Sequence, residues 1–344
     1  MQEGVLEPVR EGVREHVVKR AMGIFPPSAM RGILALVVIF AVSPTVQAAE
    51  GISDVLRWRT VNDLTVPTTV SKYSHQPEPP HWQVGLTTHF YNGKAHGENA
   101  LIDAVSFESV SLDILWRPDI ALAERWTYAM HVQLPYVSID TRSSSTVSGF
   151  DNASANASGL GDIVFTPIML AYTMDDHWQT DLQLAFYAPT GQDASTGKPS
   201  LSTHYWSIVP TVAISYHQPV TGQYASLHAS VGFNTPNDKT DYDSGDIARL
   251  SATVEQRALL LGGMVGIGLS GVGVQQLSAD SGKGVSAHSK SATTFRFWSW
   301  GPRVSYHTAV ANAVLSASLM WQNEFATQAT TEGDHVTFAL QVTY

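Results

Sequence analysis

Hydrophobic and polar residues alternate along most of the chain from residue 81 to the C-terminus. The segment 334–344 shows the pattern most clearly. Its apolar face consists of Val336, Phe338, Leu340, Val342 and Tyr344. Small or polar residues fill the intervening positions, and a period of two residues predicts a β-strand with one apolar and one polar face. Such a strand suits a wall that has lipid on one side and a wet lumen on the other.

Turn-rich stretches divide this alternating region into a series of predicted strands. Their ranges are 81–91, 105–116, 126–139, 160–173, 178–189, 203–216, 224–234, 247–257, 262–277, 294–306, 313–325 and 334–344. The connections between them are alternately long and short, as in bacterial outer-membrane barrels, whose strand number is even. We therefore expect an all-β fold, a transmembrane antiparallel β-barrel of about 12 strands. Pro167 and Pro302 lie within two of the strands and predict bulges or register shifts there.

Aromatic residues are concentrated at the predicted strand ends that flank the short connections. They are Trp82, Trp116, Trp126, Tyr172, Trp178, Tyr216, Tyr306 and Tyr344. Amphipathic rings prefer the membrane interface, so we expect a girdle at the periplasmic end of the barrel. The last strand, with Phe338 and the terminal Tyr344, resembles the C-terminal assembly signal of outer-membrane proteins. Barrel-assembly machinery and outer-membrane lipids are the partners that this resemblance implies.

The first 80 residues follow a different pattern. Residues 1–48 predict a leader with a signal peptide, in which Arg31 precedes an apolar core at 32–42 and small residues precede a cleavage site after Ala48, with Ala49 as the alternative. A short membrane anchor is the alternative, although the apolar run is far shorter than the ~20 residues of a spanning helix. Residues 49–80 show no clean period, and we expect them to form a periplasmic or lumen-lying segment. The barrel domain then spans 81–344.

Composition narrows the possible functions. Only 15% of residues are charged and the mean hydropathy is −0.04, so a helical membrane protein is not expected. The net charge of −10 argues against nucleic acid as a partner, because phosphates need a basic surface. Cysteine is absent, so the chain has no disulfides. These features fit a bacterial outer-membrane location.

Charged residues within the predicted strands are candidates for the lumen. A charge on the lipid face at mid-depth costs ~2–4 kcal/mol, so these side chains should point inward. By alternation they are Asp181, Arg249, Glu255, Arg303 and Glu324, accompanied by the polar residues Gln183, His228 and Gln322. We expect two charged zones, one towards the outer end with Arg249 and Glu324 and one towards the periplasmic end with Asp181, Glu255 and Arg303. The residues either set selectivity along a path or pair across the lumen and brace the barrel.

The sequence carries no common motif of an enzyme or of a metal site. The chain has no H-E-x-x-H motif, no phosphate-binding loop and no G-x-S-x-G elbow, and we expect no catalytic residue, cofactor or metal. Asp238, Asp241, Asp243 and Asp246 crowd one loop. Carboxylates suit hard cations, but the spacing does not fit an EF-hand, and a solvated turn is the simpler interpretation. The Ser-, Ala- and Asn-rich stretch 143–158 predicts an external loop.

Several short motifs occur together in a fixed order. They are Gly159–Pro167, Tyr187–Gly191, Tyr205-Trp206 with Pro210–Val212, Phe233–Thr235 with Thr240–Asp246, Gln275-Gln276, and Gly301-Pro302 with Val304–Tyr306. In this order they resemble the outer-membrane proteins grouped under phenol meta-pathway degradation. The resemblance implies a barrel that passes hydrophobic or aromatic compounds and no catalytic residues. The glycine-rich segment Met264–Val274 departs from the family pattern.

The function expected from these observations is an outer-membrane channel for small hydrophobic or aromatic solutes, working by passive diffusion. A barrel with a structural or adhesive role is the first alternative. An outer-membrane enzyme that modifies lipids is a weaker one, because no constellation of nucleophile and base is evident.

Overall fold

The computed structural model describes residues 52–61, 63, 81–95, 104–120, 122–143, 153–193, 199–237, 241–282 and 294–344. The chain divides into two units, Met1–Thr45 and Val46–Tyr344, and all the described residues belong to the second unit. The predicted leader, residues 1–48, lies outside the described residues. Among those described, no helix is long and apolar enough to cross a membrane.

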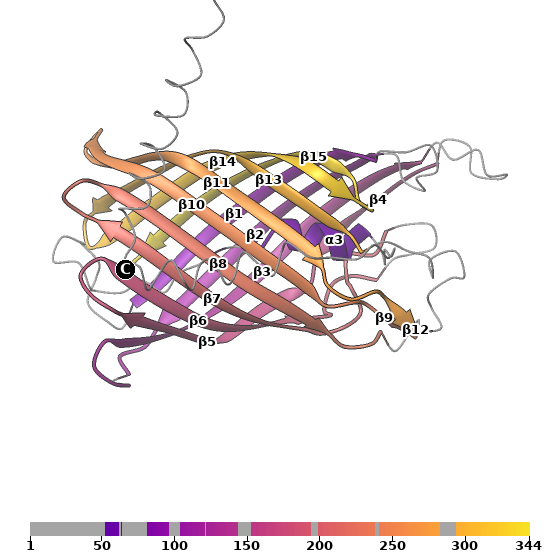
Figure 1. Cartoon of the computed structure of the whole chain (residues 1–344), viewed down its shortest axis with the longest axis horizontal. Coiled ribbons are helices and arrows are strands. Elements are labelled where there is room, and N and C mark those ends of the chain that lie inside the picture. Colours follow the sequence, from indigo (N-terminus) through magenta and orange to yellow (C-terminus); the bar gives the residue numbers. More distant parts are fainter. Residues whose placement is uncertain are drawn as a thin grey trace, which may run out of the picture. The chain divides into compact units, whose positions relative to one another are not determined.

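One antiparallel sheet closes on itself to form a barrel (Figure 1). Its strands are β1 (His81–Lys94), β2 (Ala104–Arg117), β3 (Trp126–Ser143), β4 (Ala153–Leu160), β5 (Ile163–Thr173), β6 (Trp178–Ala188), β7 (Ser207–Gln218), β8 (Gln223–Asn234), β10 (Ile247–Leu260), β11 (Gly263–Gln276), β13 (Arg296–Val310), β14 (Ala313–Gln328) and β15 (Glu332–Thr343). β1 pairs with both β2 and β15, which closes the ring. β4 and β5 both pair with β3, so the 13 strands occupy twelve places, and the predicted 12-stranded barrel is confirmed.

The structure corrects three of the predicted boundaries. Ala153–Leu160 is strand β4, whereas the sequence predicted a loop over the whole stretch 143–158. β7 begins at Ser207 rather than at residue 203. β14 and β15 are joined by only three residues, 329–331, so this connection is not a long loop. Outside the barrel wall, the two-residue strands β9 (Tyr242–Asp243) and β12 (Ser281–Gly282) pair to join two of the long connections.

The register shifts expected at Pro167 and Pro302 are found near Pro167 only. The register between β5 and β6 shifts between Phe165 and Ile168, around Pro167, as predicted. In β13 the shift lies between Arg296 and Trp298, away from Pro302. Pro302 is exposed on the outer face.

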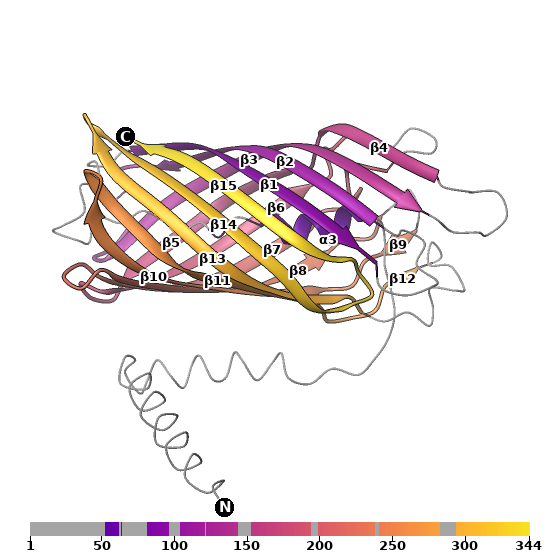
Figure 2. The same cartoon turned by 90° about the horizontal axis from the view of Figure 1, so that it is seen from above.

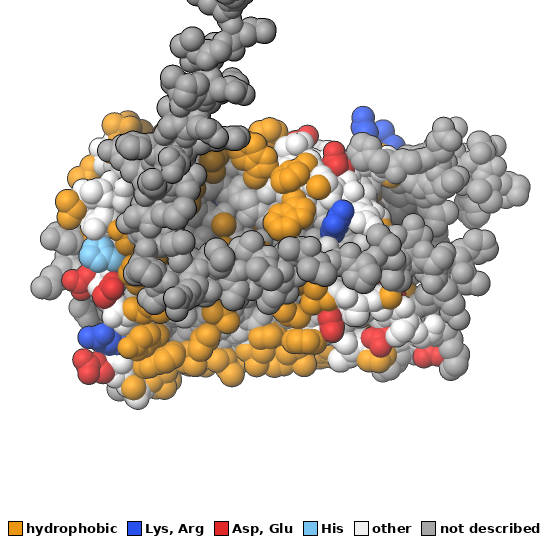
Figure 3. All heavy atoms as spheres, in the orientation of Figure 1, with side chains coloured by type: hydrophobic (Ala, Val, Ile, Leu, Met, Phe, Trp, Pro, Cys, Tyr) orange, Lys and Arg blue, Asp and Glu red, His pale blue; other side chains and the backbone are white. Residues whose placement is uncertain are grey.

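The two faces of the wall differ as the alternation predicted. In β1, Leu86 and Phe90 are exposed, whereas Thr87 and His89 are buried inside the barrel. Figure 3 shows hydrophobic side chains across the middle of the visible face and charged side chains towards its two ends. A closed wall with an apolar outer band and a polar interior is the architecture of bacterial outer-membrane barrels.

The aromatic girdle is present at the end of the barrel that carries the short turns and the C-terminus. Three cross-strand pairs have ring centroids 4.9–5.6 Å apart, and they are Trp82–Trp116, Trp126–Tyr172 and Trp178–Tyr216. We call this the periplasmic end and the opposite one the outer end, as in barrels of known orientation. The turns here are tight: Leu261 and Gly262, both with positive φ, form a two-residue connection between β10 and β11.

A helix that the sequence did not predict lies inside the barrel. This helix, α3 (Ile52–Arg59), is seen through the wall in both Figure 1 and Figure 2, away from the labelled C-terminus. Its side chains pack against the outer halves of the strands, where they join two apolar clusters with wall residues. Side chains of α3 therefore occupy part of the outer half of the lumen.

Candidate functional site

Apolar packing holds α3 in the lumen. Trp58 is 1% exposed and stacks on Tyr187 of β6 with ring centroids 6.5 Å apart. Leu56, on another side of the helix, joins a cluster that includes Phe107 of β2. Eight residues are too few for a stable isolated helix. Contacts with the barrel must therefore stabilise α3.

A buried ion pair fixes the last residue of the helix. Arg59 donates from Nε to Oε1 of Glu324 on β14 at 2.7 Å, and from Nη2 to the carbonyl of Thr331 at 2.9 Å. Its guanidinium lies 4.5 Å from the ring of Tyr91 and 4.4 Å from that of Phe297. Such a planar cation held by a carboxylate and two rings is a well-defined anchor.

A second ion pair follows four residues later. Arg249 of β10 donates to the carboxylate of Asp63 at 2.5 and 3.0 Å. Partial removal of Asp63 from water raises its pKa, but the positive charge of Arg249, with a smaller effect of His228, outweighs this and lowers the pKa to about 2. Asp63 is therefore ionised at every physiological pH.

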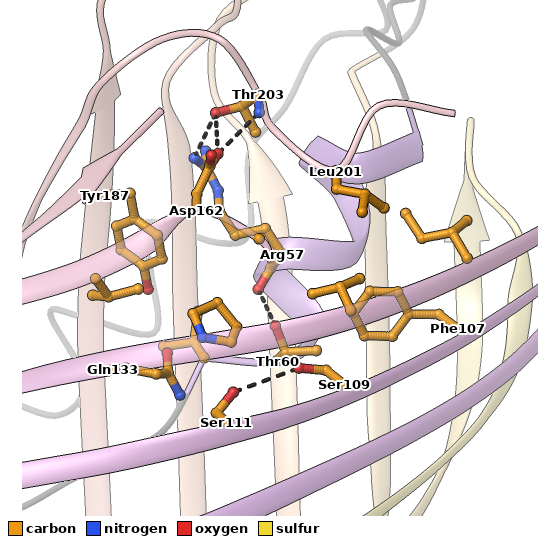
Figure 4. A pocket seen from close by; sticks show the side chains of 16 residues that line it. Arg57, Thr60, Phe107, Ser109, Ser111, Gln133, Asp162, Tyr187, Leu201 and Thr203 are labelled. Carbon is orange, nitrogen blue, oxygen red and sulfur yellow. Dashed lines mark hydrogen bonds between the residues drawn. The ribbon is translucent and has the colours of Figure 1, made fainter. Parts of the chain in front are cut away.

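A cavity of ≈ 60 Å³ lies between α3 and the wall (Figure 4). Its apolar lining includes Phe107, Tyr187 and Leu201. Uncharged polar groups also line it, among them Gln133 and the hydroxyls of Ser109 and Ser111, and so do the charged side chains of Arg57 and Asp162. This combination of rings with a few polar and charged groups is typical of sites for small, mostly apolar molecules.

Asp162 closes the cavity at the outer side. It follows Gly161 at the break between β4 and β5, and it accepts hydrogen bonds of 2.9 Å from the backbone N–H groups of Gly191 and Thr203 and from the Thr203 hydroxyl. Thr203 also accepts a hydrogen bond from Arg57 of α3 at 3.4 Å. The carboxylate thus connects the wall, the loop after β6 and the helix.

The outer charged zone contains the two residues predicted for it. Arg249 and Glu324 are buried in the lumen, 4% and 1% exposed. Arg249 pairs with Asp63, and Glu324 pairs with Arg59. Both partners belong to the N-terminal segment, and the sequence did not predict these pairs. His335 adds a hydrogen bond of 2.8 Å to Glu324.

The periplasmic zone is also present, but its residues do not form one group. Glu255 of β10 pairs with Arg303 of β13 through a contact of 2.8 Å. Asp181 of β6 is fully buried and accepts from Gln179 at 2.9 and 3.0 Å, away from that pair. His228 is buried on β8, where its ring lies within electrostatic reach of Asp63 and Arg249.

The two residues of the predicted assembly signal lie on the outer surface. Phe338 is 43% exposed and Tyr344 is 53% exposed. The backbone of Tyr344 exchanges two 2.9 Å hydrogen bonds with Trp82, which completes the ring between β15 and β1. Of the acidic loop, Asp238 lies outside the described residues. In the part of the chain that the structure describes, no group of three His, Asp or Glu side chains is placed to hold a metal ion.

Comparison with solved structures supports the fold. An outer membrane channel from Pseudomonas putida F1 aligns with a TM-score of 0.59 at 14% identity, over 80% of this chain and 99% of that one. The translocator domain of the autotransporter NalP from Neisseria meningitidis aligns with a TM-score of 0.47 at 9% identity, over 85% and 94% of the two chains. The first likeness, at 14% identity, supports the fold alone, and the second, with a TM-score below 0.5, carries no argument.

The sequence comparisons identify a family but no curated relative. No curated protein matches the chain significantly. Residues 95–340 match the model of a family described as the MetA-pathway of phenol degradation. This match covers well over half of the sequence and includes the motifs singled out above, from Gly159–Pro167 to the Tyr306 segment. The chain therefore belongs to the phenol meta-pathway degradation family of outer-membrane proteins.

Proposed function

We propose that the protein is a passive channel for small hydrophobic or aromatic solutes, which cross the outer membrane through its lumen. The observation that carries this proposal is the cavity between α3 and the wall. Its lining includes the rings of Phe107 and Tyr187 and the amide of Gln133, and the charged groups that also line it, Arg57 and Asp162, both bond to Thr203. A small aromatic molecule with one polar substituent matches that lining, whereas a strongly hydrated solute does not.

The size of the cavity indicates how passage would occur. A cavity of roughly 150 Å³ holds benzene, and this one measures only ≈ 60 Å³. A phenol-sized molecule therefore needs α3 to shift away from the wall. The helix is held by side-chain contacts and two ion pairs, and no disulfide ties it to the wall, since the chain has no cysteine. We infer that transient movement of α3 admits the solute.

The test is solute uptake by vesicles that contain the purified protein. The outer leaflet should be lipopolysaccharide, because phospholipid bilayers already let neutral aromatics through. We expect catechol to enter protein-containing vesicles faster than protein-free ones, while erythritol, a polar solute, enters both at similar rates. Equal catechol rates with and without protein would contradict the proposal.

A structural barrel is the second candidate function. It is favoured by the paired charges in the lumen, since Arg59–Glu324 and Asp63–Arg249 brace the interior. The two functions differ in one measurable respect: a structural barrel passes no solute even after α3 is released. We further propose outer-membrane lipids and the barrel-assembly machinery as partners, because Phe338 and Tyr344 are exposed on the lipid-facing surface.

A further inference from the structure

Strand β11 carries glycine where its neighbours carry long charged side chains. It lies between β10 and β13, and two of its lumen-facing positions are Gly266 and Gly268. A Cβ at residue 266 would lie 3.0 Å from Oε2 of Glu255 and 3.2 Å from Cγ of Arg257. The segment Met264–Val274 is the one that departs from the family pattern. Its glycines leave room for side chains of β10 and β13 to meet on the lumen side of β11.

Three charged side chains meet there. The two oxygens of Glu255 accept from Nε of Arg257 at 2.8 Å, from Nε of Arg303 at 2.8 Å and from Oγ of Ser305 at 3.1 Å. The side chain of Glu255 has no exposure, so one buried carboxylate serves two guanidinium groups. Arginine remains charged at any physiological pH, and the cluster therefore carries a net charge of about +1.

Part of this positive charge is accessible to solvent. The side chain of Arg303 is 28% exposed, and among the described residues its two Nη atoms have no partner, because only Nε bonds to Glu255. Arg257 lies 3.8 Å above the ring of Tyr224, which fixes its orientation. Nearby, Nε2 of His307 is buried and, within the described ranges, has no hydrogen-bond partner.

Two other buried acidic residues, Asp113 and Asp181, belong to other strands of the ring. Asp113 of β2 accepts from Thr87 at 2.8 Å and bonds to His131 at 3.1 Å. Asp181 lies on β6 and accepts from Gln179. Among the described residues, the carboxylate that contacts Arg257 and Arg303 is Glu255, so this cluster keeps its excess positive charge.

We propose that this cluster is a binding site for a small carboxylate-bearing solute at the periplasmic end of the lumen. The carboxylate would bind the two free Nη groups of Arg303, a planar fork that matches its geometry. The second guanidinium, on Arg257, adds electrostatic attraction, and Glu255 holds both arginines in place. The site is independent of solute passage along α3, and it predicts a preference for anions over neutral or cationic molecules of the same shape.

Binding of three benzene derivatives to the detergent-solubilised full chain tests this proposal. Equilibrium dialysis would compare benzoate, phenol and phenyltrimethylammonium. We expect benzoate to bind at least tenfold more tightly than the other two, and Arg303→Gln to weaken benzoate binding at least tenfold. Arg296→Gln is the matched control, since Arg296 is an exposed arginine of the same strand. Arg303→Lys should weaken binding only in part, because it keeps the charge but loses the fork.

Two results would overturn the proposal. One is equal binding of benzoate and phenol by the wild-type protein. The other is a wild-type affinity for benzoate in the Arg303→Gln variant, provided that this variant migrates as a folded barrel on unboiled gels. If Arg303→Gln does not fold, Arg257→Gln decides by the same criterion. Catechol uptake measures the proposed channel separately, so either idea can fail alone.

Discussion

Replacing Arg59 by alanine should loosen α3 and open the lumen. Arg59 is the residue through which the helix contacts Glu324, and it also bonds to the Thr331 carbonyl. Removing one partner of a buried ion pair costs about 3–5 kcal/mol. The lower value applies here, because Glu324 keeps the hydrogen bonds from Gly333 at 3.0 Å and from His335 at 2.8 Å. A loss of about 3 kcal/mol raises the ratio of undocked to docked helix roughly 100-fold.

The apolar contacts limit how far this effect goes. Val55, Leu56 and Trp58 are each at most 6% exposed. Burial of such side chains contributes about 1.5–3 kcal/mol each, which together exceeds the loss from the ion pair. The docked state should therefore still dominate in Arg59→Ala, and the lumen should open in brief events.

Single-channel recording in planar bilayers measures those events directly. We expect Arg59→Ala to open at least tenfold more often than wild type, and Arg142→Ala, the control at an exposed arginine of β3, to behave as wild type. The double variant Arg59→Ala/Glu324→Gln should open less often than Arg59→Ala alone, because it leaves no uncompensated buried carboxylate. If Arg59→Ala and wild type open equally often, the ion pair does not hold the helix.

Three further predictions concern pH, assembly and closure of the barrel. The pKa of Asp63 is lowered from 3.8 to about 2, so its pair with Arg249 stabilises the docked helix above pH ~4 and is lost as the pH falls through about 2. The opening frequency should thus be the same at pH 8 and pH 5, and a rise as the pH falls from 8 to 5 would contradict the role given to the Asp63–Arg249 pair. Deletion of Tyr344, or the substitution Phe338→Asp, should reduce the amount of protein at the cell surface and cause periplasmic accumulation or degradation. Cell fractionation would show this, and normal surface levels of both variants would refute the proposed assembly signal. A closed barrel resists SDS, so boiled and unboiled samples should migrate differently on gels, and identical migration with recovery in the soluble fraction would contradict the fold.

The wall was predictable because its signals are local. Alternation along 334–344 reports which side of the strand meets lipid, and the girdle residues, such as Trp82 and Trp116, follow from the same register. Strand β4 was missed because Ala153–Leu160 consists mostly of small and polar residues, which carry no apolar alternation. Its strand state depends on pairing with β3.

The contents of the lumen were predicted only in part. The burial of Arg249 and Glu324 follows from alternation and the cost of charge in lipid. Their partners, Asp63 and Arg59, lie 186 and 265 residues away in the sequence, and no local pattern connects them. Helix α3 has a weak signal in the spacing of Val55, Leu56 and Arg59, but a segment this short is helical only because the barrel surrounds it.

Cross-linking α3 to the wall tests the central claim most directly. Thr60 and Ser109 both line the cavity, and the chain has no native cysteine, so Thr60→Cys/Ser109→Cys can be bridged by a short bis-maleimide. Catechol uptake into lipopolysaccharide-containing vesicles would be measured before and after bridging. Our account predicts uptake by the unbridged protein and a fall to the protein-free rate once the bridge forms. Unchanged uptake after complete bridging would contradict a path that runs past α3.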